Sequence, residues 1–160
     1  MNAIDRQSQK DVLKAALRSI RQKRRLRTVD IADRMNMPLR SFEHFEAGAG
    51  RVNLEHVHRF AKATDSDAHA LIACLALGSP AFALRCADNK LMTILMVALQ
   101  ELDRDHGDAI AALDVRTLVS AFTHVFDQLG NLAERREHDA RAWLEAGIER
   151  LTSPGSTDTE

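Results

Sequence analysis

Four side chains that follow Pro38 place hydrogen-bond donors, an acceptor and an apolar group within six residues. Leu39, Arg40, Glu43 and His44 are spaced so that they share one face of a helix. An arginine can donate two hydrogen bonds to guanine, a glutamate can accept one from cytosine, and a leucine can contact the methyl group of thymine. These residues could therefore read bases if the rest of the chain holds their helix in a groove of a duplex.

The surrounding segment, residues 28–48, has the pattern of two short helices joined by a tight turn. The apolar residues that would form their inner faces are Ile31, Ala32, Met35, Phe42 and Phe45. Asn36 marks the turn because asparagine tolerates a positive φ, and Pro38 suits the first turn of the following helix. Two helices joined in this way form a helix-turn-helix, whose second helix usually enters the major groove.

Residues 17–68 resemble the DNA-binding domain of XRE-type regulators, the Cro and phage-repressor class. The matching segments, in the order of the family's helices, are 17–21, 26–32, the turn 35–37, 42–48, and Leu54, Val57, Phe60 and Ala61. The resemblance implies an all-α, five-helix repressor-like domain over residues 1–78, with helix 38–46 as its recognition helix. The chain departs from the family at two positions: Arg27 replaces the usual Ser or Thr cap, and Thr28 stands where Gln is common. We therefore expect the cap to shift to Thr28.

The resemblance also implies roles for residues outside the base-reading set. Arg21 and Glu46 match the family's partly buried ion pair between the first and third helices, which would hold the recognition helix at a fixed angle. Residues at helix ends, or in the loop that flanks the recognition helix, would contact the phosphates. These are Arg24, Arg25, Thr28, Ser41 and Arg51.

The charges are divided unevenly along the chain, although the formal net charge is only −1. Residues 1–66 carry 14 Lys and Arg against 8 Asp and Glu, whereas residues 67–160 carry 8 against 15. Basic residues crowd the end of the first helix, where they could neutralise phosphates. Cations also suit a helix C-terminus, but beside a helix-turn-helix the contact with DNA is the better interpretation.

Composition indicates an all-helical cytoplasmic protein, associated with the nucleoid when it binds DNA. Only 3 prolines and 7 glycines interrupt the 160 residues, and strand-like alternation is scarce. No run of 18 apolar residues could span a membrane, and the polar N-terminus lacks the apolar core of a signal peptide. Cys74 and Cys86 are too few for a disulfide framework, so we expect both to be reduced core residues.

Five helices are predicted near 8–24, 28–35, 38–46, 54–64 and 67–77, with Asn53 capping the fourth and Ser66 or Asp67 capping the fifth. The sequence Gly78-Ser79-Pro80 then predicts a boundary before a second helical region, residues 79–152.

The second region is predicted to contain helices near 81–87 and 89–105 and, after the cap Asp114, helical residues 115–151. The last stretch is either one unbroken helix or a hairpin that breaks near Gly130. Residues 153–160 are polar and are expected to be disordered.

Helices 89–105 and 115–151 have wider apolar faces than a small DNA-binding domain can cover, and uncovered faces bind partners. We expect a homodimer, because helix-turn-helix proteins commonly read two half-sites through twofold symmetry. A self-contained helical subdomain and a contact with a second protein are the alternatives. The residues expected in the interface are Phe122, Val125, Phe126, Leu129, Trp143, Leu144 and Ile148.

No motif indicates catalysis, a cofactor or a metal. The chain has no glycine-rich phosphate loop, and His56 and His58 would fall on different faces of their helix. The sequence therefore predicts a DNA-binding transcription regulator that is not an enzyme. Two alternatives remain: the antitoxin of a toxin–antitoxin pair, and a protein-interaction adaptor that kept the fold but lost its affinity for DNA. Leu39 and Glu43, less usual as base readers, leave room for the adaptor.

Overall fold

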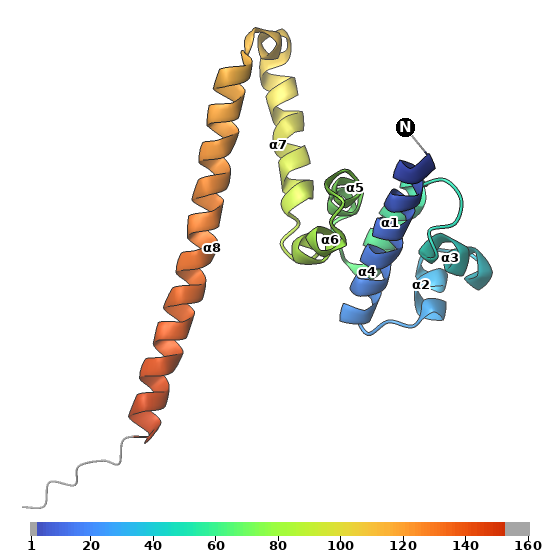
Figure 1. Cartoon of the computed structure of the whole chain (residues 1–160), viewed down its shortest axis with the longest axis horizontal. Helices are drawn as coiled ribbons and strands as arrows, with labels where there is room; N and C mark the ends of the chain where they lie inside the picture. The colour runs from blue at the N-terminus through green and yellow to red at the C-terminus, as the bar shows by residue number, and fades with distance from the viewer. Residues whose placement is uncertain (1–2, 153–160) are drawn as a thin grey trace, which may run out of the picture. The chain divides into compact units, whose positions relative to one another are not determined.

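The structure, a computed structural model, describes residues 3–152, and every regular element in that range is helical (Figure 1). The predicted all-α class is confirmed. The elements are α1 Ala3–Lys23, α2 Thr28–Arg34, α3 Leu39–Glu46, α4 Leu54–Thr64, α5 Ala68–Leu77, α6 Pro80–Cys86, α7 Leu91–His106, the 3₁₀ helix η1 Gly107–Ala112, and α8 Val115–Thr152. The predicted disordered tail, residues 153–160, lies outside the described residues. None of the described helices is long and apolar enough to cross a membrane.

The chain divides into two units, the first ending at Asp105 and the second beginning at His106. The first unit contains α1 to α6 and nearly all of α7, and the second contains η1 and α8. The boundary predicted after Gly78 falls inside the first unit, because α6 packs against both α1 and α5.

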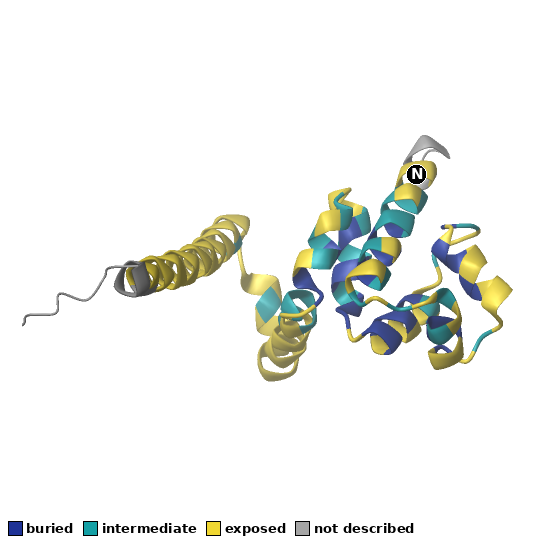
Figure 2. Ribbon diagram, turned by 90° about the horizontal axis from the view of Figure 1, so that it is seen from below, coloured by how far each residue is buried: buried dark blue, intermediate teal, exposed yellow. Residues whose placement is uncertain are grey.

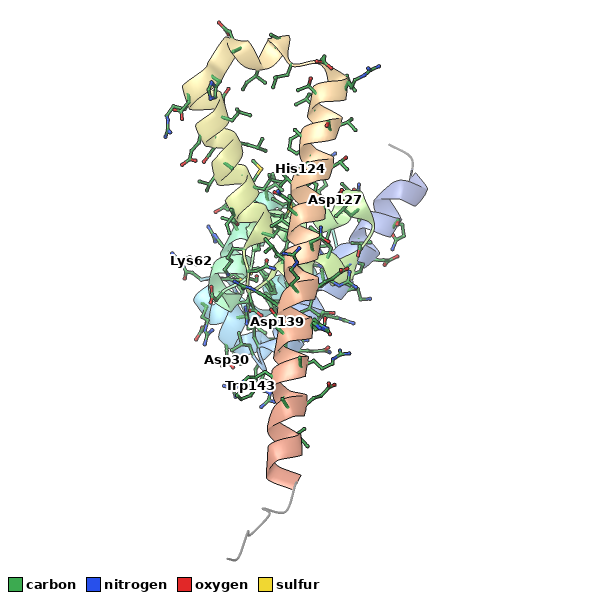
Figure 3. The ribbon with its side chains drawn as sticks, turned by 90° about the vertical axis from the view of Figure 1, so that its left-hand side faces the viewer. Asp30, Lys62, His124, Asp127, Asp139 and Trp143 are labelled. Atoms are coloured by element: carbon green, nitrogen blue, oxygen red, sulfur yellow. The ribbon has the colours of Figure 1, made fainter. Side chains whose placement is uncertain are left out.

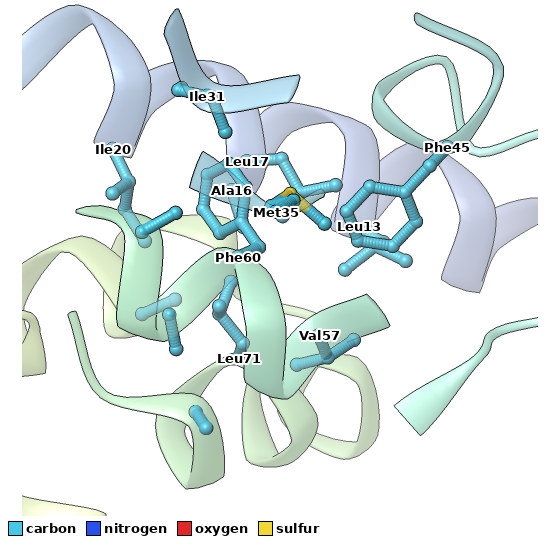
Figure 4. Packing of buried hydrophobic residues seen from close by; sticks show 14 of the residues in the cluster. Leu13, Ala16, Leu17, Ile20, Ile31, Met35, Phe45, Val57, Phe60 and Leu71 are labelled. Atoms are coloured by element: carbon cyan, nitrogen blue, oxygen red, sulfur yellow. The ribbon is translucent and has the colours of Figure 1, made fainter. Parts of the chain in front are cut away.

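The core of the first unit is formed by the inner sides of α1 to α5, together with Ala83 from α6 (Figure 4). Its fully buried side chains include Leu17, Phe42, Phe60 and Leu71. The rings of Phe42 and Phe60 stack with their centroids 6.3 Å apart and so join α3 to α4. Because burial of one such side chain stabilises a fold by about 1.5–3 kcal/mol, this contact is a principal anchor of α3.

Several helix ends lie where the local sequence predicts them. Asn53 caps α4, since its side-chain oxygen accepts hydrogen bonds from the backbone N–H groups of Glu55 and His56 at 2.9 and 3.2 Å. Asp114 caps α8 through the backbone N–H of Thr117 at 3.0 Å. These bonds satisfy donors that the first turn of a helix leaves unpaired.

The α2–α3 segment differs from the prediction in its caps but not in its turn. Because α2 begins at Thr28, the N-cap position belongs to Arg27 and not to Thr28; Asp30 accepts hydrogen bonds from both the backbone N–H and the guanidinium of Arg27. Pro38 immediately precedes α3 rather than beginning it. Asn36 has the expected positive φ, 50°.

The second unit consists mainly of α8, a single helix of 38 residues that is about 57 Å long at 1.5 Å per residue. Gly130 lies within it without a break, so the structure has the unbroken helix and not the hairpin. Figure 2 shows α8 exposed along most of its length, whereas buried residues gather in the helices of the first unit.

Candidate nucleic-acid interface

Helix α3 has one buried side and one exposed side. Phe42 and Phe45 are 0 % and 7 % exposed and pack in the core. The other side exposes the four predicted base-reading residues, Leu39, Arg40, Glu43 and His44. Within the part of the chain that the structure describes, no ion pair or side-chain hydrogen bond occupies Arg40, Glu43 or His44. Their polar atoms are therefore available to a ligand.

A bidentate ion pair joins the end of α1 to the end of α3. Arg21 Nε donates to Glu46 Oε1 at 2.5 Å, and Arg21 Nη2 donates to Glu46 Oε2 at 3.2 Å. Glu46 is only 6 % exposed, and the side chain of Arg21 is 22 % exposed. Two parallel charge-assisted bonds of this kind constrain direction as well as distance, so the pair restricts the angle between α3 and α1.

A shallow groove of about 600 Å³ runs along α3 and brings together residues from both predicted DNA-contacting sets. Arg40 and His44 come from the base-reading set, and Ser41 and Arg51 come from the phosphate set. Arg51 is exposed in the loop between α3 and α4. These four residues bring two guanidinium groups, a hydroxyl and an imidazole to the groove, all of which can hydrogen-bond to an anionic oxygen.

Two further polar side chains of this groove were not assigned a binding role from the sequence. Asn53 and His56 line it from the start of α4. The imidazole of His56 stands edge-on to Phe45 with ring centroids 5.5 Å apart. Their position in the sequence could have indicated a binding role, because both residues follow the loop that leaves α3.

The loop after α3 is shaped by a glycine. Gly48 has a φ of 70°, and a Cβ at this position would lie 2.7 Å from the backbone oxygen of Lys10. That separation is closer than real Cβ contacts, and side chains also disfavour the left-handed backbone. Gly48 therefore lets the loop pass directly against α1 on its way to Arg51.

Arg24, one of the predicted phosphate contacts, makes several contacts within the protein. Its Nε donates to the backbone oxygen of Thr64 at 2.8 Å, and its Nη2 donates to that of Asp65 at 2.6 Å. Nη2 also lies 2.7 Å from a carboxylate oxygen of Asp88. These two carbonyls belong to the C-terminal end of α4, which cations stabilise. Arg24 thus joins the end of α1 to the end of α4 through its Nε and Nη2 donors.

The other two predicted phosphate contacts lie at the connection between α1 and α2. Arg25 is exposed, has a φ of 53°, and makes no ion pair within residues 3–152. Thr28 is half-exposed as the first residue of α2. Neither residue lines the groove beside α3.

Asp67 has a second role that the sequence did not reveal. As predicted, it caps α5, where its Oδ1 accepts from the N–H groups of His69 and Ala70 at 3.0 and 3.1 Å. Its Oδ2 accepts from those of Met92 and Thr93 at 2.9 and 3.1 Å, at the start of α7. Burial alone would raise the pKa of this carboxyl, but hydrogen bonds from Thr93, Ala70 and Met92 outweigh burial and lower it. One buried carboxylate therefore joins α7 to α5.

Among residues 3–152, both cysteine thiols are buried, and the imidazoles of His56 and His58 face other rings. Cys74 is fully buried, and burial raises the pKa of its thiol to about 11, which disfavours the nucleophilic thiolate. His58 faces the ring of His69, whereas His56 faces Phe45. The described residues include no group of three His, Cys, Asp or Glu side chains that could hold a metal ion.

Comparisons of the chain with protein-family models, with curated proteins and with solved structures found no match. The geometry of α3 and its surroundings therefore carries the functional argument.

Proposed function

We propose that this protein is a sequence-specific DNA-binding transcription regulator that places α3 in the major groove. On this proposal, α2 and α3 are a helix-turn-helix of the XRE type. The main observation in its support is the exposed side of α3, where four side chains project from a helix whose opposite side is packed in the core. An α-helix fits the major groove, which is about 12 Å wide.

The fixed position of α3 supports this proposal, because base reading requires a rigid helix. Three features hold it: the Phe42–Phe60 stack, the Arg21–Glu46 ion pair, and the turn at Asn36. In the groove, Arg40 would donate to guanine and Glu43 would accept from cytosine. The side chains of Leu39 and His44 would complete the contact.

Phosphate contacts would come from the residues around α3. Arg51 and Ser41 line the groove beside the helix, and Arg25 is exposed at the connection between α1 and α2. Positively charged side chains of this kind release counterions from DNA and make binding salt-dependent. Because Arg24 is engaged with α4, it is left out of the proposed interface.

The decisive experiment is selection of duplexes from a randomised DNA pool by the full-length protein, followed by fluorescence anisotropy at several salt concentrations. We expect a defined preferred sequence. Arg40→Ala should reduce discrimination at one base pair, since a bidentate contact contributes about 1–3 kcal/mol, or roughly 5- to 150-fold. Arg51→Ala should weaken binding to all sequences alike and reduce the salt slope by about one unit.

Arg59→Ala is the matched control. Arg59 is exposed on α4, where it pairs with Glu55 and lines a different surface hollow. Its loss should change neither sequence preference nor salt slope. A folded protein that retains no duplex even at low salt would refute the proposal and favour the adaptor hypothesis. Equal losses for Arg40→Ala on preferred and random DNA would make Arg40 a phosphate contact.

A further inference from the structure

The first half of α8 has an exposed apolar side with a seven-residue repeat. Val115, Phe122 and Leu129 are seven residues apart, and so are Leu118, Val125 and Leu132. Apart from half-buried Leu118, these residues are 43–76 % exposed. Large side chains at both repeating positions are typical of a helix that packs along another helix.

The local geometry of this side suits such packing. The rings of Phe122 and Phe126 stack with centroids 6.5 Å apart, so two aromatic side chains form one ridge. A shallow hollow of about 550 Å³ lies beside them, lined by Val115, Leu118 and Val119 among others. A ridge next to a hollow allows side chains of a second helix to interlock with those of the first.

The repeat ends abruptly in the middle of α8. Residues 134–139 are all charged or histidine, and the next two repeating positions are Arg136 and Asp139. Trp143 lies beyond this break; Figure 3 labels His124, Asp127, Asp139 and Trp143 along α8. The uninterrupted apolar seam therefore runs from Val115 to Leu132, and it does not extend to the whole set of predicted interface residues.

We propose that this seam binds the same seam of a second copy of the chain, with the two α8 helices antiparallel. The proposed register places Phe122 opposite Val125 of the partner subunit. It also places Val115 opposite Leu132 of the partner subunit and Leu118 opposite Leu129 of the partner subunit. Twofold symmetry repeats each pair, so all six repeating apolar positions face apolar positions.

Other registers and directions leave mismatches. If the antiparallel partner helix is shifted by seven residues in one direction, Leu118 faces Arg136 of the partner subunit. If it is shifted by seven residues in the other direction, Leu129 and Leu132 extend past the start of the partner helix. A parallel, in-register pair would set Arg136 against Arg136 of the partner subunit and Asp139 against Asp139 of the partner subunit. Like charges at facing positions oppose association. Charge and register thus both favour the antiparallel pair.

The available surface is sufficient for a stable dimer. From the exposed fractions of the seam residues, each chain would bury roughly 600 Å² of apolar side chain, or about 1,200 Å² for the pair. That area lies at the lower end of specific interfaces. The dimer does not depend on DNA binding. If the proposed function holds, its twofold axis would relate two copies of α3.

The first experiment measures the molar mass of full-length variants by light scattering over a concentration series. We expect a dimer for the unaltered chain. Phe122→Glu should raise the dimer Kd by at least about 100-fold, because it buries a charge in the seam. His124→Glu, on the opposite side of the same turn, should remain dimeric. An unaltered chain that is monomeric at tens of micromolar, or a dimer that survives Phe122→Glu with unchanged Kd, overturns the proposal.

The second experiment tests direction and register with a short thiol-specific cross-linker. Co-expressed Leu118→Cys and Leu129→Cys chains should cross-link to each other. Neither variant should cross-link to itself, because identical residues would lie about 16 Å apart along the antiparallel pair. The native Cys74 and Cys86 are buried, and the unaltered chain serves as the background control. Self-cross-linking of Leu118→Cys would mean a parallel pair and would overturn the antiparallel assignment. Since neither experiment contains DNA, their failure is distinct from failure of the proposed function.

Discussion

Asp67→Ala is expected to lower the unfolding free energy of the first unit by roughly 3 kcal/mol, because one carboxylate serves two helices. Asp67 is 1 % exposed and accepts five hydrogen bonds, including one from the Thr93 hydroxyl at 2.8 Å. Loss of a single N-cap costs about 1 kcal/mol, and a buried donor left without an acceptor costs about 1–3 kcal/mol. The alanine variant loses two caps in a buried site.

Asn53→Ala is the matched control for one cap at an exposed position. Asn53 accepts two backbone hydrogen bonds at the start of α4, so its loss should cost about 1 kcal/mol. Urea unfolding should be followed at methyl NMR signals of the core, such as those of Leu71. The only tryptophan, Trp143, lies on α8 and would report on the second unit. If the two variants lower the unfolding free energy by amounts that agree within about 0.5 kcal/mol, the two-helix role of Asp67 is refuted.

The same carboxylate predicts a pH dependence. Its pKa is lower in the folded state than the unfolded value of about 3.9. The stabilisation is therefore present at neutral pH and is lost as the pH falls below about 4, through the folded value. Asp30, Asp65, Asp88 and Asp114 also have lowered pKa values, through their own hydrogen bonds. The informative quantity is thus the difference in unfolding free energy between the unaltered chain and Asp67→Asn. This difference should become smaller at low pH. A constant difference from pH 7 to pH 2 would contradict the assignment.

Three further substitutions or labelling measurements test the surroundings of α3 and the core. Glu46→Ala should lower the unfolding free energy by about 2–4 kcal/mol and reduce the melting temperature, because it leaves the partly buried Arg21 without its partner. Glu43→Ala, on the exposed side of the same helix, is the control and should change the unfolding free energy by no more than about 0.5 kcal/mol. Gly48→Ala should cost at least about 1 kcal/mol more than Gly50→Ala, since both have positive φ but only Gly48 closely approaches the backbone of α1; equal costs would remove the role of that approach. Cys74 should react with a thiol reagent far more slowly in the native protein than after unfolding, and rapid native labelling would contradict its burial.

The sequence by itself determined the features that depend on neighbours within a turn or two. Asn53 and Asp114 could be recognised as helix caps because the donors that they satisfy lie two or three residues away. The inward direction of Phe42 and Phe45 follows from helical spacing, and the turn at Asn36 follows from the conformational tolerance of asparagine. The all-α class could be predicted because helical periodicity is also a pattern among near neighbours in the sequence.

Only the tertiary structure decided which distant groups meet. Arg24 has the sequence position of a phosphate contact, yet its side chain donates a hydrogen bond to the carbonyl of Thr64, 40 residues later. Asp67 likewise accepts hydrogen bonds from the start of α7. Contacts of this kind form only after whole helices have packed, because the atoms belong to distant parts of the chain. Gly130 in a helix interior costs about 1 kcal/mol, which is too little to decide between a break and a continuous helix. Packing decides which distant groups meet because it sums many contacts between helices, whereas α8 is exposed along most of its length and continues through Gly130 as a helix on its own.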